Sequence, residues 1–175
     1  AFDYLIIGTK GISVLENLIV GSNTMDVIKS IKIPTLVIPT KFEHHKIHNI
    51  AFAADYEKLK DSHILEPMIE VAKLAGAEVK IVNVSEKEEA VDVPHAREGF
   101  HLHGILKGVQ HQYFTEVNEK VTDGLEVFIK ENRIDLMALI AHEYTFFDRI
   151  FHRSITKQVS RLTEIPLLII HEKIF

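Results

Sequence analysis

The sequence predicts an α/β fold in which a parallel sheet is covered by helices. Three observations carry this prediction. Short apolar runs alternate with longer amphipathic segments, two parts of the chain repeat each other at a fixed spacing, and each of those parts ends in an apolar run that begins with Ile-Pro. Strands that alternate with helices are typical of parallel sheets built from right-handed crossover units.

The elements of the longer part of the chain follow from hydrophobic periodicity. Pro67 is expected to bend the first turns of the helix that contains it, and Gly76 to end that helix. Strands are predicted at 49–55, 78–84, 112–117, 135–141 and 166–171, and helices at 63–76, 97–111, 119–132 and 155–163.

The most informative feature is an internal repeat. When the chain is shifted by 132 residues, residues 3–38 align with residues 135–170 without a gap. The run IPTLVI then falls on IPLLII, and Ser22 falls on Ser154. Both copies read as strand, loop, helix, proline-containing turn and strand. The simplest interpretation is a tandem duplication whose first copy is present only as its last third.

A glycine-rich segment joins the first strand to the first helix. Its glycines have the spacing G-x2-G-x9-G, and a serine and an asparagine follow the last one. Glycine suits places where a backbone must approach a ligand closely, and free N–H groups at a helix start attract anions. The segment is therefore a candidate phosphate loop. Alternatively, the glycines only shape a turn and the serine caps the helix. The residues concerned are Gly8, Gly11, Gly21, Ser22 and Asn23.

These motifs resemble the universal stress protein family over essentially the whole chain. The resemblance rests on GTKG at 8–11, GSNT at 21–24 and the strand IPTLVIP at 33–39. It implies a Rossmann-like, five-stranded parallel sheet with helices on both faces, accompanied by a partial copy (strand, helix, strand) of the same fold.

The resemblance also implies a division of the chain. Residues 1–39 would be the C-terminal third of a first domain, residues 40–46 a linker, and residues 47–175 a complete second domain. The remaining strands of the first domain would then precede Ala1 in the natural protein. By analogy with tandem members, residues 35–39 and 167–171 are expected to pair antiparallel as last strands. A second copy of the chain is expected to cover the open side of the first strand and to form a homodimer.

In nucleotide-binding members of the family, the glycine loop holds the phosphates, and the ends of the first two strands contact the base and ribose. The latter positions match Asp55 and Val84 in the second domain. The repeat, however, puts Ile140, Glu143 and Arg153 in place of the three loop glycines. Bulk and a negative charge then stand where phosphate would bind, so the second domain is expected to have lost ATP binding. No cofactor is expected in this chain, which leaves ATP as a ligand for the full-length protein.

Composition excludes several classes of partner. The formal net charge is −5, from 20 basic and 25 acidic residues, with no basic cluster of the kind that binds nucleic acid. No apolar run approaches the roughly 20 residues needed to cross a bilayer, and no signal peptide is recognisable. Cysteine is absent, which excludes thiol chemistry and suits a reducing compartment. A cytoplasmic protein without nucleic-acid or membrane partners is expected.

Eleven histidines raise the question of metal binding. His44, His45 and His48 lie in the linker or directly after it, and His101 and His103 would point to different sides of a helix. No metal is assigned on this pattern. Neither a nucleophile elbow nor a P-loop occurs, so no catalytic residue is assigned and no enzyme is expected.

Together these features predict a non-catalytic regulatory or scaffolding module of the stress response. One alternative is a nucleotide-binding stress protein that hydrolyses ATP slowly when full length. Another is a histidine-based metal-binding sensor.

Overall fold

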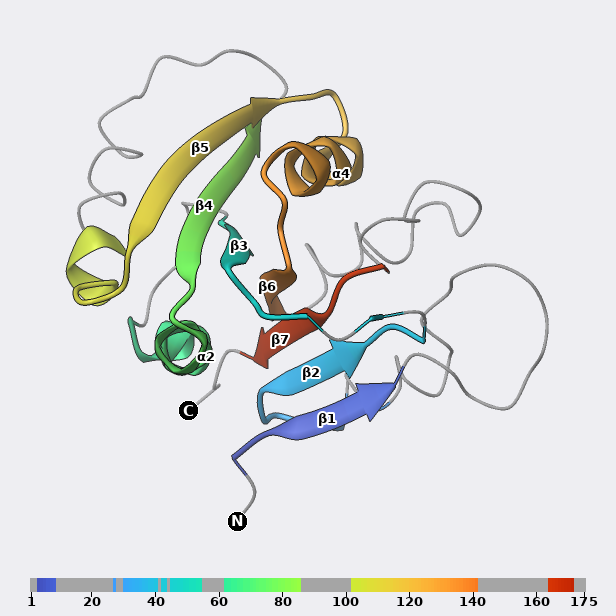
Figure 1. Ribbon diagram of the computed structural model, residues 1–175, viewed down its shortest axis with the longest axis vertical. Helices are drawn as coiled ribbons and strands as arrows, with labels where there is room; N and C mark the ends of the chain where they lie inside the picture. The colour runs from blue at the N-terminus through green and yellow to red at the C-terminus, as the bar shows by residue number, and fades with distance from the viewer. Residues whose placement is uncertain are drawn as a thin grey trace.

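Seven strands form one sheet in the computed structural model, which describes residues 3–8, 27, 30–40, 42–43, 45–54, 62–85, 102–141 and 164–171. The strand order is β1-β2-β7-β6-β3-β4-β5, so β1 and β5 are the edges (Figure 1). The strands are β1 (Leu5–Gly8), β2 (Thr35–Ile38), β3 (Asn49–Ala53), β4 (Glu78–Ser85), β5 (His111–Val117), β6 (Leu136–Ala141) and β7 (Leu167–His171).

Strand directions divide the sheet into two parts. The five strands β7-β6-β3-β4-β5 are all parallel to their neighbours, which confirms the predicted five-stranded parallel sheet. Strands β1 and β2 are parallel to each other, but β2 runs antiparallel to β7, with Leu36 opposite Leu168. This pairing confirms the predicted antiparallel contact between residues 35–39 and 167–171.

The sequence repeat has a counterpart in the hydrogen-bond register. Leu5 lies opposite Thr35 in the β1–β2 pair, and Met137 lies opposite Leu167 in the β6–β7 pair. In each pair the first residue donates its N–H to the carbonyl of the proline that precedes the second strand, over 2.9 and 3.0 Å. The same 132-residue shift therefore relates the sequence, the register and the proline contact.

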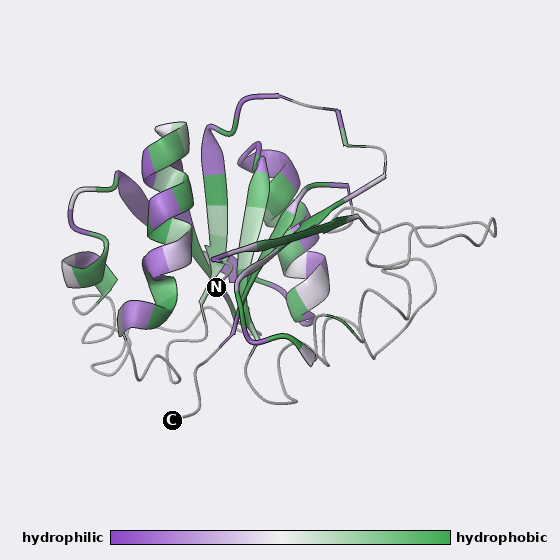
Figure 2. Cartoon of the chain, turned by 90° about the horizontal axis from the view of Figure 1, so that it is seen from below, coloured by the Kyte–Doolittle hydropathy of each residue, from purple (hydrophilic) through white to green (hydrophobic). Residues whose placement is uncertain are grey.

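Helices cover both faces of the parallel sheet. A 3-10 turn, η1 (Ser62–Leu65), and α2 (Glu66–Ala75) lie on one face, and α4 (Val121–Glu131) lies on the other. The apolar sides of both helices face the sheet (Figure 2). Among the described residues, no helix is both long and apolar enough to span a membrane.

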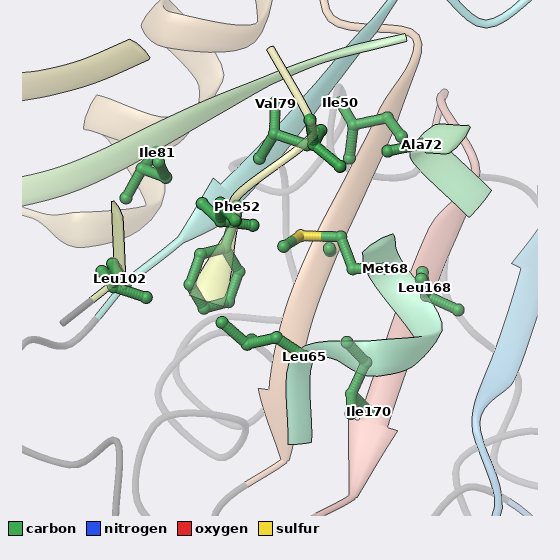
Figure 3. Packing of buried hydrophobic residues seen from close by; sticks show 14 of the residues in the cluster. Ile50, Phe52, Leu65, Met68, Ala72, Val79, Ile81, Leu102, Leu168 and Ile170 are labelled. Atoms are coloured by element: carbon green, nitrogen blue, oxygen red, sulfur yellow. The ribbon is translucent and has the colours of Figure 1, made fainter. Parts of the chain in front are cut away.

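Alternate residues of each central strand feed two separate cores, because successive side chains of a strand point to opposite faces. In β3, Ile50 and Phe52 pack under α2, whereas Ala51 and Ala53 pack under α4. Phe52 points toward Leu65 and toward other side chains of the α2 face (Figure 3). A strand buried on both faces is apolar throughout, which is why these runs show no polar alternation.

Two predicted helices differ from those observed. The segment 63–76 is not one bent helix: Pro67 lies in the first turn of α2, where a missing N–H costs nothing, and a 3-10 turn precedes it. Gly76 ends α2 as predicted, with φ of 63°. The segment 97–111 was predicted as one helix, and this is wrong at its C-terminal end. The described helical residues are 102–105, Gly108 has φ of 89°, and His111 already belongs to β5.

The N-terminal segment contributes to both cores. Val37 of β2 is 1% exposed and packs on the α4 side, while Tyr4 packs on the α2 side. The Tyr4 hydroxyl donates to the Glu70 carboxylate of α2 over 2.5 Å. Burial, the hydrogen bond to Glu70 and its charge raise the pKa of Tyr4, so this hydroxyl stays protonated. Residues far apart in sequence are thus held in one structure.

Candidate functional site

Gly8 and Val84, the two candidate nucleotide residues that the structure describes, lie at or near the carboxyl ends of strands, where ligands bind in open α/β sheets. Parallel strands end at the same edge of a sheet, so β3, β4 and β6 end together. Strands β1 and β2 run the other way, because β2 is antiparallel to β7. Gly8, which ends β1, and Val84, near the end of β4, are therefore at opposite ends of the sheet.

Gly8 is the one predicted phosphate-loop residue within the described part of the chain. It is exposed and ends β1 opposite Ile38. Its φ is not left-handed, and a Cβ added there would approach only the Ile38 carbonyl, at 4.0 Å. Neither its backbone angle nor a neighbour among the described residues requires a glycine at this place. Gly11, Gly21, Ser22 and Asn23 lie outside the described residues.

The opposite end of the sheet holds the predicted nucleoside side. Val84 is partly buried, pairs with Glu116 of β5, and packs on the α4 side. The neighbouring Asn83 donates from Nδ2 to the Ala54 carbonyl over 3.2 Å and so ties the ends of β3 and β4 together. The sequence analysis did not single out Asn83. The feature that could have indicated it is a polar amide side chain near the end of an otherwise apolar strand. Asp55 lies outside the described residues.

The residue that the 132-residue shift aligns with Gly8 is buried. Ile140 is 4% exposed and belongs to the core under α2, next to the end of β6. An aliphatic side chain packed in a core cannot make room for a phosphate without opening a cavity. Glu143, Arg153 and Ser154 lie outside the described residues.

Two of the linker histidines lie beside Asp135, at the start of β6. One carboxylate oxygen accepts the N–H groups of His48 and Asn49 over 2.7 and 2.9 Å. The other lies 3.2 Å from Nε2 of His45. These contacts fix the entry of β3 beside β6 and give the linker a structural role. His44 lies outside the described residues.

A second histidine pair lies at the start of β5. Nδ1 of His103 is 2.9 Å from Nε2 of His111. The sequence pattern paired His103 with His101 instead, which lies outside the described residues. No group of three or more possible metal-ligating side chains occurs in the part of the chain that the structure describes.

His171 ends β7 at the junction with the N-terminal segment. Its Nε2 is buried, without a hydrogen-bond partner among the described residues. Burial lowers the pKa of His171 below 6.5, and the nearby Lys32 charge lowers it further. The ring is therefore held neutral, which suits a packed position better than an acid–base role.

Comparison with known proteins gives similarity in structure but not in sequence. No family model matches the sequence, and no curated protein matches it. A universal stress protein from Archaeoglobus fulgidus DSM 4304 superposes with a TM-score of 0.55 at 17% identity, over 81% of this chain and 50% of that one. A functionally unknown protein from Pseudomonas aeruginosa PAO1 gives a TM-score of 0.64 at 11% identity, over 97% of this chain and 63% of that one.

One of the similar structures contains a nucleotide. A universal stress protein from Archaeoglobus fulgidus in complex with dAMP superposes with a TM-score of 0.51 at 14% identity, over 72% of this chain and 99% of that one. The chain thus has the fold of universal stress proteins: a parallel sheet with helices on both faces. It spans only about half to two thirds of the length of the two longer proteins.

Proposed function

We propose that this chain is a non-catalytic regulatory or scaffolding module of the universal stress protein class, in which the complete parallel sheet no longer binds ATP. The observation that carries the proposal is the antiparallel β2–β7 junction. It turns the Gly8 end of the sheet away from the Val84 end, so the phosphate-loop candidate and the nucleoside-side candidate cannot serve one ligand.

The state of the second copy supports the same proposal. Where the first copy has the exposed Gly8, the second has Ile140 packed in the core. Backbone N–H groups bind phosphate only where side chains leave them accessible. The burial of Ile140 thus supports the loss of phosphate binding at the end of β6.

A nucleotide-binding function is the second candidate. The dAMP complex of the Archaeoglobus fulgidus protein favours it, because that protein has the same fold. Gly8 is exposed at the end of β1. In this alternative the first copy would bind phosphate and take its base and ribose contacts from residues outside this chain.

Titration calorimetry with ATP and dAMP separates the two candidates. We expect no saturable binding below the millimolar range and no rise in melting temperature, since a ligand that binds only the folded state must raise it by mass action. A micromolar isotherm would overturn the proposal. In that event Gly21→Arg should abolish binding if the first copy is responsible, whereas Val84→Lys should abolish it if the second copy is.

We further infer that the open side of β1 is covered by a second copy of the chain. Within the described residues, β1 has one strand neighbour, β2. Its Ile6 is 67% exposed. An edge strand with an exposed apolar side chain is a template for pairing with another chain. Such pairing would give the module the symmetric, self-complementary contact that homodimers use.

A further inference from the structure

Two histidines that are eight residues apart converge at the start of the edge strand β5. His103 lies in the helical stretch 102–105 and is exposed, while His111 is the first residue of β5 and is half-buried. Their rings lie 4.9 Å apart between centroids, with 2.9 Å between Nδ1 of His103 and Nε2 of His111. The turn between them brings the two ring nitrogens face to face.

The turn that holds this pair is anchored on both sides. Leu102, Leu106 and Val109 are buried in the α2-side core, and they alternate with the exposed residues of the turn. The Leu106 N–H bonds to the Leu102 carbonyl, and the Val109 N–H to the Leu106 carbonyl, each over 2.9 Å. Gly108, with φ of 89°, lets the chain reverse into the strand. The spacing of the two imidazoles is therefore set by packed backbone.

Hydrogen bonding fixes the orientation of the His111 ring. Its Nδ1 lies 2.8 Å from the Val109 carbonyl, which can only accept, so Nδ1 carries a proton and donates. The Tyr113 ring also packs edge-on against His111, with centroids 5.7 Å apart. In neutral His111 the lone pair of Nε2 consequently points at His103. A backbone carbonyl that holds the far nitrogen is the arrangement that orients metal-bound histidines.

We propose that His103 and His111 form a two-histidine site for an imidazole-binding divalent transition metal ion such as Zn²⁺, Ni²⁺ or Cu²⁺. Without metal, one proton of His103 Nδ1 bridges the two nitrogens. When His103 carries its proton on Nε2 instead, both lone pairs are directed into the space between the two rings. A metal ion there replaces the bridging proton.

Metal binding needs a rearrangement of the pair. Two imidazole nitrogens at about 2.0–2.1 Å from a tetrahedral Zn²⁺ are about 3.3 Å apart. The observed separation is 2.9 Å. Rotation of the exposed His103 side chain must widen this separation and turn both lone pairs off the line between the two nitrogens toward the ion. Nitrogen ligands select Zn²⁺, Ni²⁺ and Cu²⁺ over Mg²⁺ and Ca²⁺, which prefer oxygen.

A site with two protein ligands leaves the other coordination positions to water. The bound ion therefore exchanges readily, and it joins the 102–111 turn to the edge of the sheet. This inference is independent of nucleotide binding, because His103 and His111 lie at the edge strand β5 and are not among the candidate nucleotide residues. The histidine pattern of the sequence alone had led to no assigned metal.

Zn²⁺ titration of the whole chain by calorimetry tests the proposal, with Mg²⁺ as the ion that should not bind. We expect His103→Gln and His111→Gln each to weaken Zn²⁺ binding by at least about tenfold, the scale that loss of even an outer-shell partner produces. His48→Gln is the matched control, because it removes one exposed imidazole that has no role in the pair. It should leave the affinity unchanged.

Electron paramagnetic resonance of one equivalent of Cu²⁺ gives a second readout. Two coordinated nitrogens are expected in the unmodified chain and one in His103→Gln, which should fold normally because His103 is exposed. Equal Zn²⁺ affinity in all variants, or an equal loss in His48→Gln, would overturn the proposal. So would a Cu²⁺ spectrum that is the same with and without His103.

Discussion

At the scale of single residues, Gly124 decides how closely α4 can approach the sheet. It is the fourth residue of α4 and is buried, and glycine inside a helix normally lowers helix stability by about 1 kcal/mol relative to alanine. A Cβ added there would lie 2.7 Å from Cγ1 of Val84 and 3.1 Å from Cβ of Asn118. The absence of a side chain at Gly124 therefore allows α4 to pack closely against the ends of β4 and β5.

Gly124→Ala should destabilise the fold. Overpacking costs about 1–3 kcal/mol, and the gain in helix propensity offsets only about 1 kcal/mol of it. The free energy of unfolding in urea measures the difference.

The same substitution at Gly104 is the control, because a Cβ there meets nothing within 4 Å. Gly104→Ala should be neutral or slightly stabilising. If Gly124→Ala were the more stable of the two variants, close packing would not be the reason for this glycine.

At the scale of elements, Asp135 joins the linker to two strands of the sheet. Its carboxylate accepts the first two N–H groups of the β3 entry, and the Asp135 N–H itself donates to the Asn49 carbonyl over 2.9 Å. The sequence repeat aligned Asp135 with Asp3 but did not indicate a role for either residue.

Asp135→Ala should lower the free energy of unfolding by about 1–3 kcal/mol, because two N–H groups lose a charged acceptor. Asp3→Ala is the control at the equivalent position of the repeat. Asp3 is exposed, so its loss should change stability by no more than about 0.5 kcal/mol. Thermal and urea unfolding measure both variants. Equal effects at the two positions would contradict the role given to Asp135.

The predicted and observed elements also differ where hydrophobic periodicity does not distinguish a helix from a turn. The order of strands and helices could be predicted, because periodicity reports which faces are buried. The helix predicted at 97–111 extended too far toward its C-terminal end, because the spacing of its apolar residues is compatible with both a helix and a turn. Leu102, Leu106 and Val109 are all buried, but only the positive φ of Gly108 brings the chain into β5. No periodicity encodes that angle.

At the scale of the whole molecule, the N-terminal segment extends the sheet past β7 and leaves β1 as an edge. A segment of two short strands could not bury enough surface to fold alone. Antiparallel pairing of β2 with β7 supplies that burial, and Val37 and Thr35 become buried there. The same pairing leaves Ile6 on the outer strand exposed.

Light scattering should therefore give a mass of about twice the 20.0 kDa of one chain. Ile6→Lys should shift the protein to monomers, because a charge on an edge strand opposes pairing. Leu74→Lys is the control, since Leu74 is 90% exposed on α2 and far from β1 in sequence. A mass near 20 kDa for the unmodified chain at working concentrations would rule out the dimer.

Periodicity and composition alone predicted which residues form strands, which segments resemble each other at a 132-residue spacing, and which positions resemble a phosphate loop. These are local or periodic properties, and a strand buried on both faces can be recognised from its composition alone. The candidate site could be predicted only as a set of positions. Whether Gly8 and Val84 share an end of the sheet depends on the direction of β2 against β7.

The resemblance to a known family had predicted that direction, and the tertiary structure confirmed it and with it the separation of Gly8 from Val84. Only the tertiary structure brought His103 to His111 and Asn83 to Ala54, contacts made by side chains whose sequence spacing carries no signal. The physical reason is the same in each case. Pairing between strands joins residues through hydrogen bonds whose partners are fixed by register and packing, and neither is a property of a single segment.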